Sequence, residues 1–235
     1  MWVKICANTN LEDALLAAKL GADAVGFVFA PSKRLVTPAE VARITPHLPE
    51  GLERVGVFPA WSAEKIAATV REAGLTGVQL HGGFDPELVR ALDEVFEGRI
   101  KIIQTVHWVV TAGESSEAEV MKQLRLIAQM PVERVLVDSK VGEATGGTGV
   151  PFNWAAASGV FAADHGLKLI LAGGLRPENV GEAIERLQPW GVDVASGVEA
   201  SAGRKDLEKV ARFIGRAKAL RERPQPPGPD AGEAA

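Results

Sequence analysis

The sequence predicts an α/β protein, a single (β/α)8 TIM barrel of the phosphate-binding type, on three observations. Short apolar runs rich in β-branched residues alternate with amphipathic helix-like segments along most of the 235 residues. Eight such units imply a parallel sheet, and the length suits one closed barrel, which typically takes about 250 residues. The last two apolar runs end in glycine turns, which suggests a phosphate site at the carboxyl-terminal face of the barrel.

The elements follow in order along the chain. Residues 11–20 carry apolar side chains at one helical face, and Thr37-Pro38-Ala39-Glu40 combines a capping threonine, an early proline and a glutamate three positions on. Asp85-Pro86-Glu87 and Arg176-Pro177-Glu178 resemble that helix start. The predicted strands are 2–7, 24–29, 54–59, 77–82, 100–107, 134–138, 168–173 and 191–196. We expect the barrel to cover residues 1–222 and the proline-rich tail 223–235 to be disordered.

Composition and charge exclude several classes of function. A formal net charge of −4, without a long block of like charge, argues against nucleic acid as a partner. No apolar run approaches the roughly 20 residues that span a membrane, and the chain enters a strand pattern at once, so no signal peptide is expected. The one cysteine is compatible with a reducing compartment. We expect a cytoplasmic protein, monomeric or homodimeric, whose partner is a small phosphorylated molecule.

The phosphate site is predicted at two turns. One run ends in Gly173-Gly174 and the next ends in Ser196-Gly197. Glycine lets the backbone approach an anion closely, and free N–H groups at a helix start attract negative charge.

Two residues at predicted strand ends are candidates for acid–base chemistry. Cys6 ends the first strand; it is either a small buried apolar residue or a general base, provided that neighbours lower its pKa. Asp138 ends the sixth strand; it either caps the following loop or acts as a general acid or base facing Cys6 across the barrel mouth.

Other residues are candidates for holding the substrate. Arg34 is either a solvated surface residue or a guanidinium that binds a carboxylate with two parallel hydrogen bonds. Gln79 and His81 end the fourth strand; His81 is either a catalytic base or, as we prefer, a hydrogen-bonded wall residue. The glycine-rich loop with Gly147 and Thr148 is expected to cover the substrate. His47, His107 and His165 show no ligand spacing with one another or with Cys6, so no metal site is expected.

Together these motifs resemble the phosphoribosylanthranilate isomerase family of tryptophan biosynthesis, over about residues 3 to 220. Single glycine turns are weak signals, whereas the ordered set is strong. The matching segments are Val3-Lys4-Ile5-Cys6, Gly21-Ala22-Asp23, Gly26-Phe27, Ser32-Lys33-Arg34, Val78-Gln79-Leu80-His81-Gly82, Val137-Asp138, Gly146-Gly147-Thr148-Gly149, Phe152-Asn153-Trp154, Leu171-Ala172-Gly173-Gly174-Leu175, Pro177-Glu178-Asn179-Val180, Asp193, Ser196-Gly197-Val198-Glu199 and Lys205-Asp206.

The resemblance implies an enzyme that uses no cofactor. It would convert N-(5-phosphoribosyl)anthranilate to 1-(2-carboxyphenylamino)-1-deoxyribulose 5-phosphate, an Amadori rearrangement. The family's pattern assigns Cys6 as general base, Asp138 as general acid and Arg34 as the group that holds the anthranilate carboxylate, with the two glycine turns on the phosphate. In one departure, Ala7 stands where the family usually has glycine, which bears on the shape of the first loop.

Three alternatives remain at this point. The histidine-pathway aminoaldose isomerase typically uses two aspartates, at the ends of strands 1 and 5, where this chain has Cys6 and Thr105-Val106-His107. Indole-glycerol-phosphate synthase needs a lysine and a glutamate inside the barrel, and no strand-end lysine is apparent. A non-catalytic phosphosugar-binding barrel would need neither Cys6 nor Asp138.

Overall fold

The computed structural model describes residues 1–109, 116–140 and 154–219. Eight parallel strands close into a barrel in chain order, and β8 pairs with β1. This confirms the predicted fold. The strands are β1 (Trp2–Ile5), β2 (Ala24–Val28), β3 (Glu53–Phe58), β4 (Gly77–Leu80), β5 (Lys101–Val109), β6 (Arg134–Lys140), β7 (Lys168–Ala172) and β8 (Gly191–Val194).

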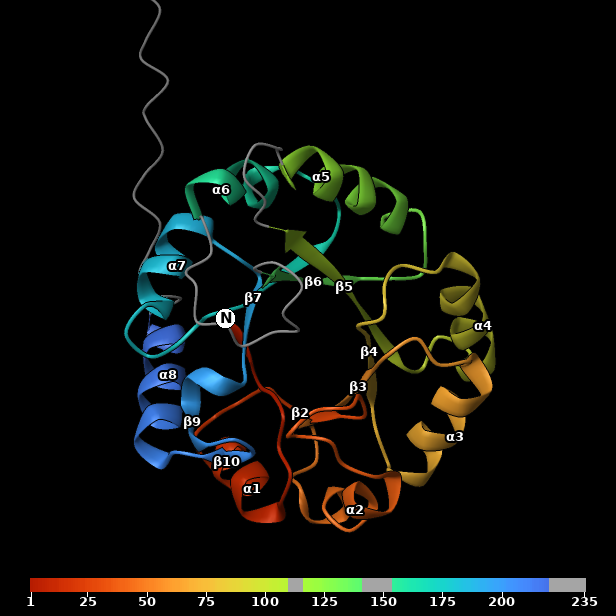
Figure 1. The fold of residues 1–235 in the computed structure, drawn as a ribbon, viewed down its shortest axis with the longest axis vertical. Helices are drawn as coiled ribbons and strands as arrows, with labels where there is room; N and C mark the ends of the chain where they lie inside the picture. Colours follow the sequence, from red (N-terminus) through yellow and green to blue (C-terminus); the bar gives the residue numbers. More distant parts are fainter. Residues whose placement is uncertain (110–115, 141–153, 220–235) are drawn as a thin grey trace, which may run out of the picture.

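Helices form an outer ring around the strands (Figure 1). They are α1 (Leu11–Lys19), α2 (Pro38–Ala42), α3 (Ala63–Glu72), α4 (Pro86–Phe96), α5 (Ser116–Ile127), α6 (Trp154–Ala162), α7 (Val180–Leu187) and α8 (Leu207–Ala219), with short 3-10 turns η1 (Thr45–His47) and η2 (Ser196–Val198) and the hairpin β9 (Glu199–Ser201) and β10 (Arg204–Lys205). Each described helix is too short or too polar to cross a lipid bilayer. The tail 223–235 lies outside the described residues.

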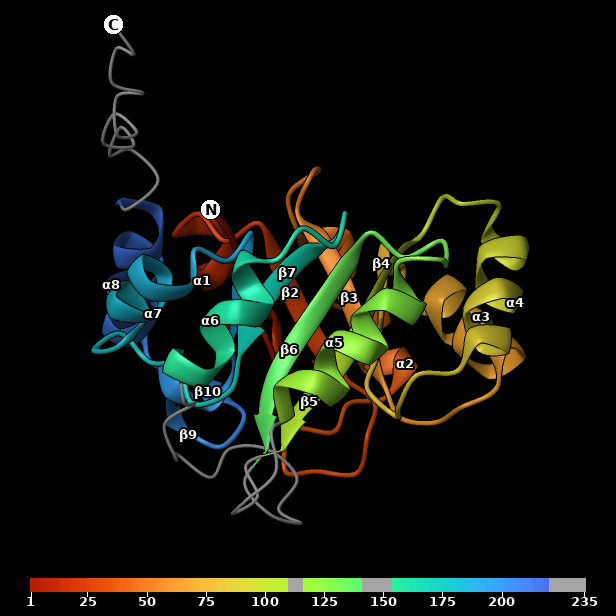
Figure 2. The same ribbon diagram turned by 90° about the horizontal axis from the view of Figure 1, so that it is seen from above.

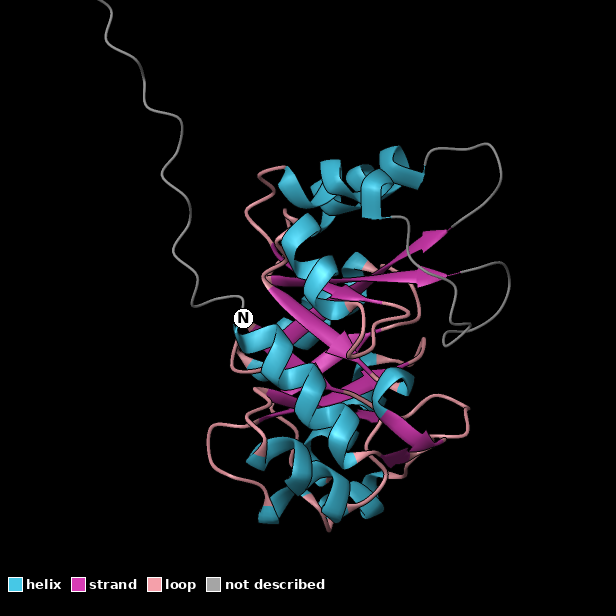
Figure 3. Ribbon diagram, turned by 90° about the vertical axis from the view of Figure 1, so that its left-hand side faces the viewer, coloured by secondary structure: helices cyan, strands magenta, loops and turns pink. Residues whose placement is uncertain are grey.

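The strand directions define one functional face. In the side views, the strand arrowheads point to the same side of the molecule (Figures 2 and 3), and Figure 2 shows the hairpin of β9 and β10 at that side. The carboxyl ends of all eight strands therefore surround one opening, which we call the barrel mouth. In this fold, the loops and strand ends at that opening carry the functional groups.

Every strand ends one or two residues away from its predicted end, and three of these differences bear on the site. β5 continues to Val109 and β6 to Lys140, pairing side by side to that point. Asp138 thus lies inside β6, two residues before its end, rather than at the end. β1, in contrast, stops at Ile5 and not at residue 7, so Cys6 is the first residue after the strand.

Helix starts mostly follow the local signals. Thr37 and Glu40 form a reciprocal capping box at α2, and the Asp85 side chain accepts hydrogen bonds from the first turn of α4. At α7 the helix begins only at Val180. The reason is local: the Asn179 side chain is occupied in closing the preceding turn, through bonds with the Arg176 N–H and the Gly174 carbonyl.

The barrel interior is apolar at its floor and polar above it. Trp2, Ala24, Val55, Ile103, Leu136, Ile170 and Ala172 pack together inside the barrel. Side chains two positions apart on a strand share a face. The residues that follow Trp2, Ile103 and Leu136 at that spacing are Lys4, Thr105 and Asp138, and two positions beyond Lys4 and Thr105 come Cys6 and His107. Because every second side chain of a strand faces the barrel interior, these polar and reactive groups lie inside the barrel toward the mouth.

Candidate active site

Cys6 is held at the mouth by the strands on either side of β1. Its backbone N–H donates to the Val194 carbonyl of β8 at 2.8 Å, and its side chain is buried. On the β2 side, a Cβ placed on Gly26 would lie 2.6 Å from the Cys6 Sγ. Glycine is therefore required at position 26 for the thiol to keep its place.

Ala7 adopts a left-handed backbone conformation, with φ of +61°. That region suits glycine and costs other residues roughly 1–2 kcal/mol. The departure from the family pattern noted in the sequence is therefore an alanine in a conformation that favours glycine.

A buried ion pair lies one layer below Cys6. The Lys4 Nζ is 2.7 Å from the Asp193 Oδ1, and these residues are register partners on β1 and β8. The Lys4 side chain is fully buried. Lys4 was not among the predicted site residues, because the prediction considered only strand ends. Its position does indicate an inward side chain, since residues two apart on a strand share a face and Lys4 lies two positions before Cys6. The expectation that no strand ends in a lysine was wrong: β6 ends at Lys140, and Lys4 lies inside the barrel.

The charges around Cys6 act in opposite directions on its thiol. Burial raises the pKa of Cys6 above its ordinary value; the ammonium groups of Lys4 and Lys205 oppose the rise, and the Asp193 carboxylate adds to it. The neighbours expected to lower the pKa are present, but burial outweighs them. Burial would also lower the pKa of Lys4, yet Asp193 and Cys6 outweigh that effect and raise it, so Lys4 stays charged.

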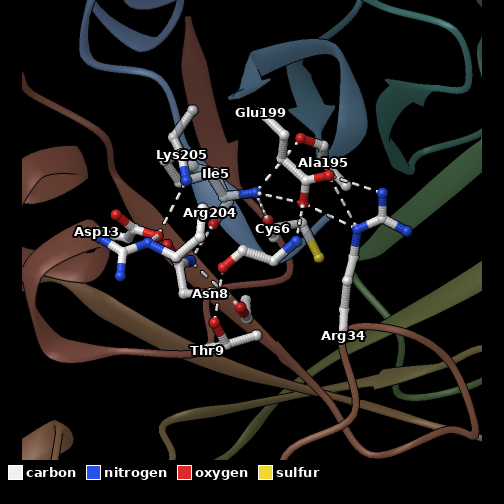
Figure 4. Close-up of polar contacts among 12 residues, drawn as sticks. Ile5, Cys6, Asn8, Thr9, Asp13, Arg34, Ala195, Glu199, Arg204 and Lys205 are labelled. Carbon is white, nitrogen blue, oxygen red and sulfur yellow. Dashed lines mark hydrogen bonds and ion pairs between the residues drawn. The ribbon is translucent and has the colours of Figure 1, made fainter. Parts of the chain in front are cut away.

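Lys205 connects the end of the chain to the first loop. Its buried Nζ donates to the Cys6 carbonyl at 2.6 Å and to the Ala195 carbonyl at 3.3 Å, and it lies 3.4 Å from a Glu199 oxygen (Figure 4). Burial lowers the pKa of Lys205, while Glu199 and Cys6 favour its charged form. This lysine was not among the predicted site residues, because only the closed barrel brings it beside Cys6.

Arg34 reaches over the mouth from the loop after β2. Its guanidinium makes a two-pronged contact with Glu199, with Nε to Oε1 at 2.8 Å and Nη2 to Oε2 at 2.7 Å. Burial alone would raise the pKa of Glu199, but the hydrogen bonds from Arg34 and the charge of Lys205 lower it. Glu199 therefore stays ionised and fixes the orientation of Arg34, whose side chain lies on the same side of the cluster as the Cys6 sulfur (Figure 4).

Asp138 lies across the mouth from Cys6. β6 is three strands from β1 around the closed barrel, with β7 and β8 between them. Asp138 is in register with His107 of β5. His81, directly after β4, packs edge-on against His107, with ring centroids 4.8 Å apart. Gln79 is buried below and donates to the Thr105 hydroxyl at 3.2 Å. His81 thus lies between β4 and β6 in contact with His107, and its role as a wall residue stays a prediction.

The two glycine turns pack directly against each other. Gly173 and Gly174 have φ values of +88° and +63°, and Ser196-Gly197 forms the start of η2. A Cβ on Gly197 would overlap the Leu175 carbonyl oxygen, so only glycine permits this approach. None of the N–H groups of Gly173, Gly174, Ser196 and Gly197 donates to another residue in the described part of the chain. Four backbone donors are therefore available beside one another.

Gly147 and Thr148 lie outside the described residues, so the loop expected over the substrate is not part of this geometry.

The expectation of no metal site came from spacing along the chain. Barrel closure brings His81 and His107 together with Asp138 from strands far apart in sequence. Spacing could not reveal that cluster, because adjacent strands of a barrel are separated by whole helices.

A model of the N-(5'-phosphoribosyl)anthranilate (PRA) isomerase family matches residues 3–216. The chain belongs to this family. The PRA isomerase of Thermotoga neapolitana is 44% identical over 219 residues, which cover 93% of this chain and 98% of the relative. The crystal structure of phosphoribosyl anthranilate isomerase from Thermotoga maritima matches with a TM-score of 0.80 at 41% identity, covering 94% of this chain and all of that one.

A further solved PRA isomerase is in complex with reduced 1-(o-carboxyphenylamino)-1-deoxyribulose 5-phosphate. It has a TM-score of 0.78 and 39% identity, and it covers 94% of this chain and 100% of that one. Membership of the PRA isomerase family confirms the resemblance and makes this chain an aldose–ketose isomerase of tryptophan biosynthesis. It decides against the histidine-pathway isomerase, indole-glycerol-phosphate synthase and the non-catalytic barrel.

Proposed function

We propose that the chain converts N-(5-phosphoribosyl)anthranilate to 1-(2-carboxyphenylamino)-1-deoxyribulose 5-phosphate, with Cys6 as general base and Asp138 as general acid. The observation that carries the assignment is the placement of these two groups. They come from β1 and β6, on different sides of one mouth, and both have the inward parity of the floor residues Trp2 and Leu136. A sugar between them can be protonated on one side and deprotonated on the other.

The reaction needs two proton movements from the protein. Asp138 donates a proton to the furanose oxygen, the ring opens, and a protonated imine, which keeps the nitrogen-bound hydrogen, forms at sugar C1. The imine acidifies the C2 hydrogen, which the Cys6 thiolate removes. The resulting enol becomes the ketone as C1 gains a proton and the C2 hydroxyl loses one, so substrate and product are isomers. General acid and base groups typically contribute about 10²–10⁴-fold each.

The remaining substrate groups match the rest of the mouth. Arg34 would hold the anthranilate carboxylate through guanidinium donors other than those that bind Glu199. The phosphate would bind the open N–H groups of Gly173, Gly174, Ser196 and Gly197. Gln79 and His81 would line the substrate on the β4 side, and Gly147 and Thr148 remain assigned to substrate binding from the sequence.

An anthranilate fluorescence assay with freshly made substrate tests the assignment. Cys6→Ser and Asp138→Asn should each lose at least about 10²-fold in kcat while still binding product. Arg34→Lys should raise KM because lysine keeps the charge but loses the two-pronged geometry. Inorganic phosphate should inhibit competitively. A Cys6→Ala variant that keeps more than roughly a tenth of wild-type kcat would remove Cys6 as the base.

The partner is thus a small phosphorylated substrate, with the chain acting as a monomer or a homodimer. Size-exclusion chromatography with light scattering distinguishes these two states.

A further inference from the structure

Two imidazoles and a carboxylate converge on the β4–β6 side of the mouth. One ring nitrogen each from His81 and His107 and one carboxylate oxygen of Asp138 all lie within 4.8 Å of one another. The two rings are nearly perpendicular, with an interplanar angle of 87°. The three residues belong to neighbouring strands or strand ends, so the backbone of the barrel fixes their spacing.

The orientation of the His107 ring suits a role as a metal ligand. Its Nε2 lies 3.4 Å from the His81 carbonyl oxygen. A carbonyl accepts only, so Nε2 carries the proton in this contact and Nδ1 carries the lone pair. Histidines that bind metal ions almost always donate their other N–H to a carbonyl or carboxylate in this way, which fixes tautomer and ring orientation. The Nδ1 of His107 is shielded from solvent.

We propose that His81, His107 and Asp138 form a binding site for a borderline divalent ion of the first transition row, such as Zn²⁺ or Co²⁺. Two imidazoles and one carboxylate suit these ions rather than Mg²⁺ or Ca²⁺, which prefer oxygen ligands. Tetrahedral bonds of about 2.0–2.1 Å hold ligand atoms roughly 3.3 Å apart. The three ligand atoms lie within 4.8 Å of one another, so the side chains must rotate to reach this spacing.

The ion inhibits rather than assists. Bound at Asp138, it neutralises the carboxylate and occupies the oxygen that would donate the proton. This consequence rests on the proposed role of Asp138, whereas binding of the ion does not. The site would therefore make turnover sensitive to free Zn²⁺, with reversal by a chelator.

The first experiment measures binding alone. Untagged full-length protein is titrated with Co²⁺, and the visible d–d absorption is followed. We expect one ion per chain. His107→Gln should weaken binding at least tenfold, and the exposed His47→Gln should leave it unchanged. Cys6→Ser should keep the spectrum, because the thiol is not a ligand. Equal binding by His107→Gln and wild type, or loss of the spectrum in Cys6→Ser, would overturn the site.

The second experiment measures turnover with and without Zn²⁺. Each protein is compared with its own turnover without Zn²⁺: wild type should be inhibited and recover with a chelator, whereas His107→Gln should resist inhibition. Inhibition of both proteins at the same Zn²⁺ concentration would refute a site at His107. One-to-one Co²⁺ binding through His107, together with undiminished turnover, would support the site and instead remove Asp138 as the acid. The two proposals are therefore separable.

Discussion

Lys4 and Asp193 form an ion pair 2.7 Å long inside the barrel, one layer below the thiol of Cys6. Because the pair is out of water, breaking it leaves one uncompensated buried charge, which typically costs about 3–5 kcal/mol. We expect Lys4→Met to lower the free energy of unfolding by about that amount in chemical denaturation. The double variant Lys4→Met with Asp193→Leu should recover most of the loss. Equal destabilisation in the two proteins would show that the pair is not the cause.

The thiol of Cys6 can be titrated without interference. The chain has one cysteine and no tyrosine, so thiolate absorbance near 240 nm reports Cys6 alone. Burial raises the pKa of this thiol, so the midpoint should lie above the reference value of about 8.5. Cys6→Ser supplies the baseline. A midpoint at or below that reference would mean that Lys4 and Lys205 outweigh burial.

Gly26 positions the thiol from the neighbouring strand. A methyl group at Gly26 would lie 2.6 Å from the Cys6 sulfur, so Gly26→Ala should turn the thiol away from the mouth. We expect kcat to fall at least tenfold while circular dichroism stays native. The matched control is Gly215→Ala on α8, where a Cβ meets no atom within 4 Å; alanine there should stabilise the helix by about 0.5–1 kcal/mol. Full activity in Gly26→Ala would show that the thiol tolerates the methyl group.

The Glu199 carboxylate forms ion pairs with both Arg34 and Lys205. Glu199→Gln should cost about 1.5–3 kcal/mol of stability, the usual value of charge-assisted hydrogen bonds, and should raise KM through misplacement of Arg34. Its folded pKa is lowered. The contribution is therefore full above the unfolded value near 4.3 and is lost as pH falls through the lower folded pKa. Thermal melts of variant and wild type should converge in acid.

The control for this variant is Glu178→Gln, whose partner Arg212 forms an ion pair that is half-exposed. Exposed pairs contribute about 0–1 kcal/mol, so this change should be nearly silent. If Glu178→Gln lowered stability as much as Glu199→Gln, burial of the Glu199 carboxylate would not explain the stability loss.

The sequence predicts the features that depend on neighbours along the chain. Alternation and glycine turns located all eight strands and placed Cys6 within one residue of the end of the first. The helix start of α7 was misplaced because Asn179 binds the preceding turn instead of capping. Local patterns cannot show such a diversion of a side chain.

Features made by barrel closure could not be predicted in this way. Lys4 meets Asp193, and Arg34 meets Glu199, only because the first and last strands become neighbours. His81, His107 and Asp138 have no ligand motif along the chain and meet only across adjacent strands. Pairings of this kind depend on register, which no single segment contains.

The surroundings of Cys6 have a consequence for folding. The Lys205 ammonium binds the Cys6 carbonyl across 199 residues of sequence, and Thr9 binds the Gly203 carbonyl across 194. Contacts between such distant segments close the largest loops and form slowly. The first loop therefore gains its final shape only when the last strand and hairpin dock. Recovery of catalysis should mark the final step of refolding, after most secondary structure has returned.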